Sequence, residues 1–108
     1  MNFSIIPTPP FEKDLKQLTK KYPSLKKDIA ILATRLLEEP KMGTALGNDC
    51  YKIRLAISSK GKGKSGGARV ITYVKIIETT IFLLSIYDKA DAANISDKEL
   101  KERLKGLK

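Results

Sequence analysis

Apolar residues in the first forty positions recur at the spacing of two amphipathic helices. The first stripe contains Phe11, Leu15, Leu18 and Tyr22, at intervals of three or four residues, which places them on one helix face. The second stripe contains Leu25, Ile29, Leu32, Leu36 and Leu37. Pro23 and Pro40 end the two helices, while Thr8 and Ser24 can cap their N-termini. The pattern predicts a short strand at Phe3–Ile6, followed by a helical hairpin that packs on a sheet.

From Tyr51 onward, apolar and polar positions alternate with the period of a strand. One face carries Tyr51, Ile53, Leu55 and Ile57, and the other carries Lys52, Arg54 and Ala56. Ala68–Ile77 is rich in β-branched residues, and Thr80–Tyr87 is the most apolar run of the chain, so both are expected to be central strands. The three runs predict an antiparallel meander, whereas Lys41–Asp49 is predicted to be a loop because it contains glycine and asparagine.

The C-terminal part predicts one more helix. Ser96 and Glu99 form the capping-box pattern, and Leu100, Leu104 and Leu107 give the helix a narrow apolar stripe. The element order is therefore β-α-α-β-β-β-α. We expect an α+β fold in which an antiparallel sheet carries the helical hairpin on one face, with a C-terminal helix after it. The 108 residues fit a single domain that spans positions 1–108.

Charge changes this picture, because it is concentrated in one part of the chain. The sequence has 21 basic and 12 acidic residues, a net charge of +9. The segment Tyr51–Lys75 contains no acidic residue, and its basic residues are Lys52, Arg54, Lys60, Lys62, Lys64, Arg69 and Lys75. A local field of this kind suits a polyanion, and nucleic acid is the commonest one.

Within this segment, Ser58–Gly67 is predicted to be a mobile link, because it is polar and rich in glycine. Its lysines form either a solvated loop or an arm that follows a phosphate backbone. In the second interpretation the candidate RNA-binding residues are Lys60, Lys62, Lys64, Tyr73 and Lys75.

The composition also restricts the possible chemistry. The chain has no histidine, which removes the usual general base near neutral pH and the usual metal ligand. Its single cysteine, Cys50, excludes an internal disulfide, is expected to be buried and fits a reducing cytoplasm. No apolar run approaches the length of a membrane span, and the start MNFSIIPTPP does not have the pattern of a signal peptide. We therefore expect no metal site and no cofactor.

RNA cleavage by its own 2′-hydroxyl is one reaction that clustered cations can catalyse. Arginines can stabilise the negative phosphorane, and a lysine among other cations can exchange protons because nearby positive charge favours its neutral form. Lys52, Arg54 and Arg69 lie on two consecutive predicted strands and could face one another. Charged residues on a wet sheet face can equally be ordinary surface.

The order and spacing of several motifs resemble the RelE/ParE superfamily of toxins from bacterial toxin–antitoxin pairs. These motifs are CYKIRL, a glycine-containing link, ARVITY, and FLLSIY followed by Asp-Lys. The extended link GKGKSGGARVI and the strand end LLSIYDK are most similar to the HigB-type branch. The resemblance covers Cys50–Leu104 and agrees with the position of the helical hairpin.

The resemblance implies a toxin that enters the ribosomal A site and cleaves mRNA as a metal-independent endoribonuclease. It also implies a cognate antitoxin that neutralises the toxin. Ribosome and mRNA would be the other partners, and the free toxin is expected to be a cytoplasmic monomer with no membrane association.

The family's residues carry over position by position. Lys52 and Arg54 match two basic residues near the scissile phosphate, and Arg69 matches an arginine that stabilises the transition state. Lys89 falls near a further family arginine. Ile95 falls where the family has a tyrosine, so the pattern breaks there. The catalytic candidates are Lys52, Arg54, Arg69, Lys89 and Tyr87, and Tyr73 is the alternative to Tyr87 for proton transfer.

Two other functions remain open at the level of sequence. A ParE-like toxin would poison DNA gyrase by binding, without nuclease chemistry, and would not need the three cations together. A plain RNA-binding module would show steep salt dependence without toxicity.

Overall fold

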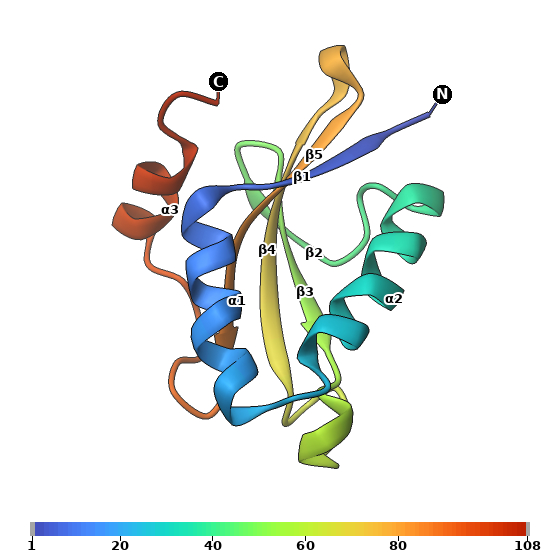
Figure 1. Cartoon of the computed structure of the whole chain (residues 1–108). Coiled ribbons are helices and arrows are strands. Elements are labelled where there is room, and N and C mark those ends of the chain that lie inside the picture. Colours follow the sequence, from blue (N-terminus) through green and yellow to red (C-terminus); the bar gives the residue numbers. More distant parts are fainter. Residues whose placement is uncertain (1, 108) are drawn as a thin grey trace.

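A single five-stranded sheet with three α-helices forms the computed structural model, which describes residues 2–107 (Figure 1). The elements are β1 (Ser4–Pro7), α1 (Pro9–Lys21), α2 (Leu25–Glu38), β2 (Thr44–Gly47), β3 (Cys50–Leu55), β4 (Ala68–Lys75), β5 (Thr80–Asp88) and α3 (Asp97–Leu104). Short 3₁₀ turns occupy Ser58–Lys60 and Ile76–Glu78. The α+β class, the helical hairpin and the closing helix are confirmed.

The strand order in the sheet is β1-β5-β4-β3-β2. The predicted meander of β3, β4 and β5 is antiparallel throughout. Two details of the sheet differ from the sequence prediction. First, β1 pairs in parallel with β5, so the sheet is mixed. The sequence did not predict this pairing, because apolar spacing does not reveal which strand an isolated N-terminal strand will pair with.

The second difference is β2, which lies within the predicted loop Lys41–Asp49. β2 and β3 form a hairpin in which Gly47 pairs with Cys50. The two turn residues, Asn48 and Asp49, have φ values of 55° and 60°. Two-residue hairpin turns need this left-handed backbone, and Asn and Asp tolerate it. The glycine, asparagine and aspartate therefore mark a hairpin turn and not an open loop.

The two faces of the sheet are covered by different elements. Residues of the helical hairpin, such as Leu25 and Leu36, pack with Ile53, Val70 and Ile86 in one buried cluster. Leu100 and Leu104 of α3 pack with a second cluster, which contains Cys50, Ile71, Tyr73 and Leu84. In Figure 1, α1 and α2 lie in front of the left and right parts of the sheet, and α3 lies to the left of α1. Alternate residues of β3, β4 and β5 therefore contribute to opposite faces.

The helix caps and the buried face of α2 agree with the sequence prediction, with two corrections. Thr8 caps α1 by accepting a hydrogen bond from the Phe11 amide, and Ser96 caps α3 by accepting one from Glu99. Ser24 precedes α2 but makes no capping bond, because its hydroxyl binds Asp28 and the 58–60 turn. Leu37, predicted to lie on the buried face of α2, is 49% exposed.

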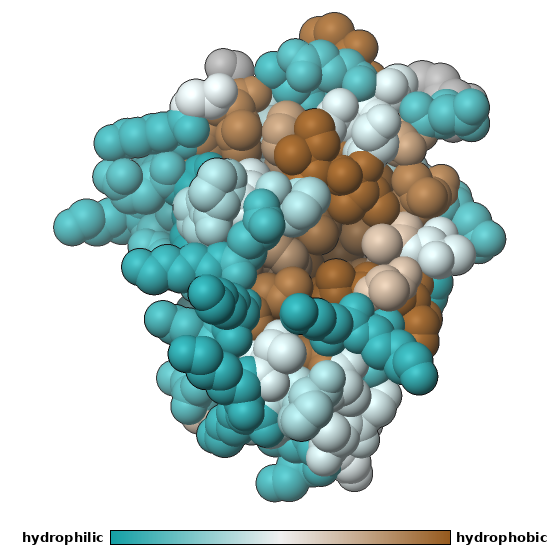
Figure 2. All heavy atoms as spheres, viewed as in Figure 1, coloured by the Kyte–Doolittle hydropathy of each residue, from teal (hydrophilic) through white to brown (hydrophobic). Residues whose placement is uncertain are grey.

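Polar and apolar surfaces are separated on the helical-hairpin face. Figure 2 shows apolar surface in the upper part of this view, between the helices, and polar atoms at the lower end, where the 58–67 loop lies. No helix within residues 2–107 is long and apolar enough to cross a membrane.

Candidate functional site

A row of three side chains crosses β3, β4 and β5 at the centre of the predicted site. Arg54 lies opposite Arg69, and Arg69 lies opposite Tyr87. Their neighbours Ile53, Val70 and Ile86 belong to the helical-hairpin cluster, so the row occupies the other face of the sheet. Like charges directly opposed across two strands are destabilising. This arrangement of arginines therefore favours an anionic ligand.

Arg69 is only 4% exposed, because the loop before β4 folds over it. Its Nη1 donates to the carbonyl oxygens of Lys64 and Ala68, both at 3.0 Å, and its Nη2 donates to that of Ser65 at 3.4 Å. A guanidinium has five N–H donors, so further donor capacity remains after these three bonds. The Gly61–Gly66 tip of the loop must shift before a ligand can contact this side chain fully.

Tyr87 has a buried hydroxyl group that makes no hydrogen bond of normal geometry with the described residues. Burial raises the pKa of Tyr87, while the charge of Arg69 and the backbone of Ile95 oppose the rise. Tyr87 and Ile95 also line one pocket of about 410 Å³. The Tyr87 hydroxyl thus lies close to Ile95, the position at which the family resemblance predicts a tyrosine.

Lys52 and Lys89 are the other two predicted catalytic cations, and their side chains have different surroundings. The ammonium group of Lys52 donates to the Asn94 side-chain oxygen at 2.6 Å, so the connector after β5 holds it on the same sheet face. Asn94 was not predicted as a site residue, since a polar connector gives no periodic signal. The side chain of Lys89 is exposed, and its backbone amide bonds the Gly67 carbonyl at 3.1 Å.

The root of the lysine loop is anchored, so the prediction of a mobile link is wrong for Ser58–Lys60. The buried Asp28 carboxylate accepts hydrogen bonds from the amide and hydroxyl groups of Ser58, at 3.0 and 2.6 Å. The hydroxyl of Ser24 also donates to Asp28 and accepts from the Ser59 amide. Although burial raises the pKa of Asp28, these hydrogen bonds lower it overall. The 3₁₀ turn is therefore fixed to the start of α2.

Lys60 is fixed by a second carboxylate, on the helical-hairpin face. Its ammonium lies 2.7 Å from Oδ1 of Asp88, which is 1% exposed, and 5.5 Å from the ring centroid of Tyr22. The Tyr22 hydroxyl donates to the same carboxylate at 2.6 Å. Burial alone would raise the pKa of Asp88, but the bonds from Lys60, Tyr22 and the Ala90 amide lower it to about 2. Lys60, predicted as an RNA contact, is therefore placed as an anchor of the loop.

The remaining predicted RNA contacts lie in two separate places. The side chains of Lys62 and Lys64 are exposed at the loop tip. Tyr73 is 6% exposed and stacks on Phe82, with ring centroids 5.8 Å apart. Lys75, at the far end of β4, bonds Glu78 and the Leu107 carbonyl. The structure therefore brings Lys52, Arg54, Arg69 and Tyr87 together on one face, and leaves Tyr73 and Lys75 apart from them.

Asp88 and Tyr22 hold the loop root beside the site through Lys60, a role that was not predicted from the sequence. A lone carboxylate directly after the most apolar strand was a usable signal, because buried carboxylates require a partner. Groups of three or more histidine, cysteine or acidic residues that could hold a metal ion do not occur within positions 2–107.

Comparison with known proteins identifies the family and agrees with the fold. The family model described as "RelE toxin of RelE / RelB toxin-antitoxin system" matches residues 11–107. The structure is similar to a mutant of the E. coli toxin RelE in the free state, with a TM-score of 0.67 and 19% identity over 100% of both chains.

Two toxin–antitoxin complexes also contain chains of this fold. The match to the intact E. coli RelBE complex has a TM-score of 0.55 and 24% identity, and covers 82% of this chain and 96% of the other. The match to a complex from Mycobacterium tuberculosis has a TM-score of 0.60 and 18% identity, and covers 82% and 99%. At these identities the structural likeness establishes the fold.

Proposed function

The chain belongs to the RelE toxin family of toxin–antitoxin systems, and on that premise we propose that it is a ribosome-dependent endoribonuclease. Its substrate is mRNA in the ribosomal A site, its site of action is the cytoplasm, and its effect is to stop translation. A cognate antitoxin neutralises it, and the shared fold with toxin chains from two toxin–antitoxin complexes supports such a partner. The free toxin acts as a monomer.

The observation that carries this proposal is the opposition of Arg54 and Arg69 across β3 and β4. Two positively charged residues at directly opposed positions of a sheet face destabilise it unless an anion lies between them. A phosphorane is such an anion, and it carries most charge in the transition state of RNA cleavage, where preorganised donors have the largest effect on rate. Lys52, two residues from Arg54, adds a third cation on the same face.

The row also supplies groups for proton transfer. We assign charge stabilisation to Arg54 and Arg69, and removal of the 2′-hydroxyl proton to Lys52. We assign proton donation to the leaving 5′-oxygen to Tyr87, because its phenol is protonated at neutral pH and it lies opposite Arg69 in the row. Lys89 supplies a further exposed cation at the end of β5.

Production of the toxin in bacteria without its antitoxin provides the test. We expect growth arrest, and primer extension on mRNA should find cuts at codons in the ribosomal A site. Purified toxin should cut mRNA on programmed ribosomes. A fall in DNA supercoiling with intact mRNA would instead establish the ParE-like mode. If neither mRNA cleavage nor a loss of supercoiling occurred, only the RNA-binding module would remain.

Tyr87→Phe is expected to lower the cleavage rate roughly 100-fold, at the lower end for loss of a general acid. Since the acid works while it is protonated, its contribution should be present at neutral pH and lost as pH rises through the raised pKa. Single-turnover rates across pH measure this effect. Tyr73→Phe is the matched control, because that ring stacks on Phe82 outside the row. Equal rates for the two variants would remove Tyr87 from the mechanism.

The loop lysines are expected to divide into two groups. Changing Lys62 and Lys64 together to glutamine should raise the half-saturating toxin concentration about tenfold and flatten its salt dependence. The maximal rate should stay unchanged, because these exposed side chains lie outside the catalytic row. Lys60→Gln should instead lower the stability of the fold, through loss of its ion pair with Asp88. A fall in maximal rate alone would contradict this division.

A further inference from the structure

A pocket of about 190 Å³ opens between α2 and the end of β3, beside the proposed catalytic row. Three cationic side chains line it: Arg35 from α2, Arg54 from β3, and Lys64 from the loop. We propose that this pocket is a second phosphate-binding subsite, which holds the RNA strand one or more nucleotides away from the scissile phosphate. The inference rests on the proposed function and extends it to a residue, Arg35, that neither the sequence pattern nor the family match singled out.

The positive charges in this pocket are only partly balanced by the protein. Within residues 2–107, no carboxylate lies at ion-pair distance from Arg35, Arg54 or Lys64. Asp28 also lines the pocket and brings one negative charge, but its two oxygens are turned towards Ser24 and Ser58, from which they accept three hydrogen bonds. With three cations and one carboxylate the lining has an excess of positive charge over apolar walls, and such a concave site concentrates anions. The pocket therefore attracts an anion.

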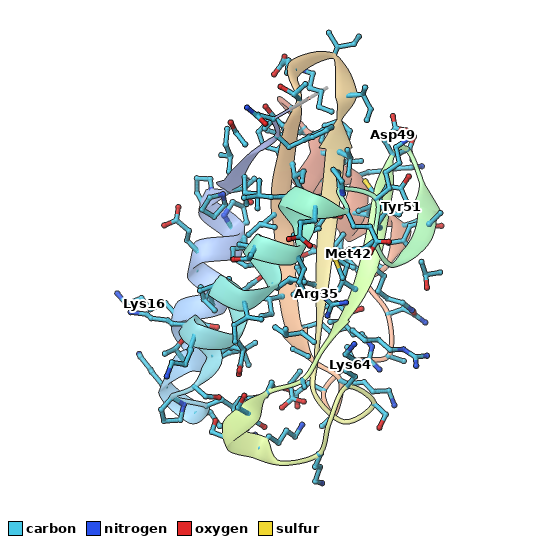
Figure 3. All side chains as sticks on the ribbon, turned by 90° about the vertical axis from the view of Figure 1, so that its right-hand side faces the viewer. Lys16, Arg35, Met42, Asp49, Tyr51 and Lys64 are labelled. Atoms are coloured by element: carbon cyan, nitrogen blue, oxygen red, sulfur yellow. The ribbon has the colours of Figure 1, made fainter. Side chains whose placement is uncertain are left out.

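The fold brings the three cations together from separate elements. In Figure 3, Arg35 and Lys64 lie on the same side of the molecule near the end of β3, whereas Lys16 extends from α1 at the other edge. Lys64 is positioned through its own carbonyl, which accepts a hydrogen bond from Arg69. The side of the pocket that Lys64 forms is therefore coupled to the catalytic arginine.

Arg54 decides between RNA and an acidic peptide as the occupant. This residue belongs both to the catalytic row, opposite Arg69, and to the pocket. The row and the pocket lie on opposite faces of the sheet, but Arg54 stands on the edge of β3 beyond Lys52, the last residue that pairs with β2. An RNA strand whose scissile phosphate lies at the row can therefore pass round this edge into the pocket, so one backbone can use both places. The apolar floor formed by Leu32, Leu55 and Ala56 accepts the ribose or base between the phosphates.

Arg35→Gln tests the subsite through RNA affinity, separately from cleavage. The probe is a single-stranded RNA oligonucleotide with 2′-O-methyl groups, which cannot be cut, titrated by fluorescence anisotropy at several salt concentrations. We expect about tenfold weaker binding and a log–log salt slope that is smaller by about one, as for loss of one phosphate contact. Lys16→Gln removes the same charge from an exposed position on α1 and should bind like the wild type.

Three results would overturn the subsite. These are equal affinity of the two variants for RNA, no binding of the oligonucleotide by the wild type, and an effect of Arg35→Gln on antitoxin affinity alone. The last result would assign the pocket to an acidic peptide. Cleavage of mRNA on ribosomes by the wild type, measured in parallel, decides the proposed function independently of these outcomes.

Discussion

Replacement of Arg69 by alanine is expected to lower the rate of mRNA cleavage about 100- to 1000-fold, the loss typical of one donor to transition-state charge. Arg69 lies opposite both Arg54 and Tyr87, so its guanidinium is central to the row and can form bidentate bonds to a phosphorane. Single-turnover cleavage on programmed ribosomes, at saturating toxin, measures the chemical step directly.

Arg69 also ties the loop to the sheet through the carbonyls of Lys64 and Ser65, so a control must separate catalysis from loop order. Arg69→Lys retains a cation but loses the planar fork, and should recover only a small part of the rate. Amide hydrogen exchange of residues 61–66 should increase in both variants. Antitoxin affinity should remain, which shows an intact fold. Full cleavage by the alanine variant would remove Arg69 from the mechanism and leave it a structural role.

The catalytic row shows what periodicity can predict. Alternation in Tyr51–Ile57 placed Lys52 and Arg54 on one face, and the order of the strands made β4 their neighbour. The direct opposition of Arg54 and Arg69 follows from the register, which the hydrophobic pattern restricts to one face but does not fix residue by residue. A β-bulge between Ile71 and Thr72 shifts the register of β4 against β5, and no sequence signal marked it.

The support around the row could not be derived from periodicity, because it depends on single contacts between distant segments. Lys60 and Asp88 are 28 positions apart, and Tyr22 and Asp88 are 66 apart. A lysine in a glycine-rich loop has the same local pattern whether it is solvated or paired. The burial of Asp88 makes the difference, since a carboxylate enclosed on a sheet face requires cations and donors around it.

Asp88→Ala is expected to reduce the free energy of unfolding by about 3 kcal/mol, as for removal of one partner from a buried ion pair. The change leaves the Lys60 ammonium and the Tyr22 hydroxyl without their carboxylate, and frees the loop root from β5. Urea denaturation at pH 7 measures the loss. Asp91→Ala, an exposed carboxylate three positions on, is the matched control and should change stability by less than about 0.5 kcal/mol.

The wild type and Asp88→Ala are expected to differ in free energy of unfolding, and the pH dependence of that difference tests whether it is electrostatic. The pKa of Asp88 falls from its ordinary value of 3.8 to about 2 in the folded protein. A folded pKa below the unfolded one gives stability that is present above pH 3.8 and lost as pH falls towards 2, and this accounts for about 2 kcal/mol. Asp28, whose pKa is also lowered, titrates in both proteins and cancels in the comparison. The gap between wild type and Asp88→Ala should therefore narrow over this range. A gap that stays constant down to pH 2 would mean that the carboxylate acts through packing, and that the loop root is not held by charge.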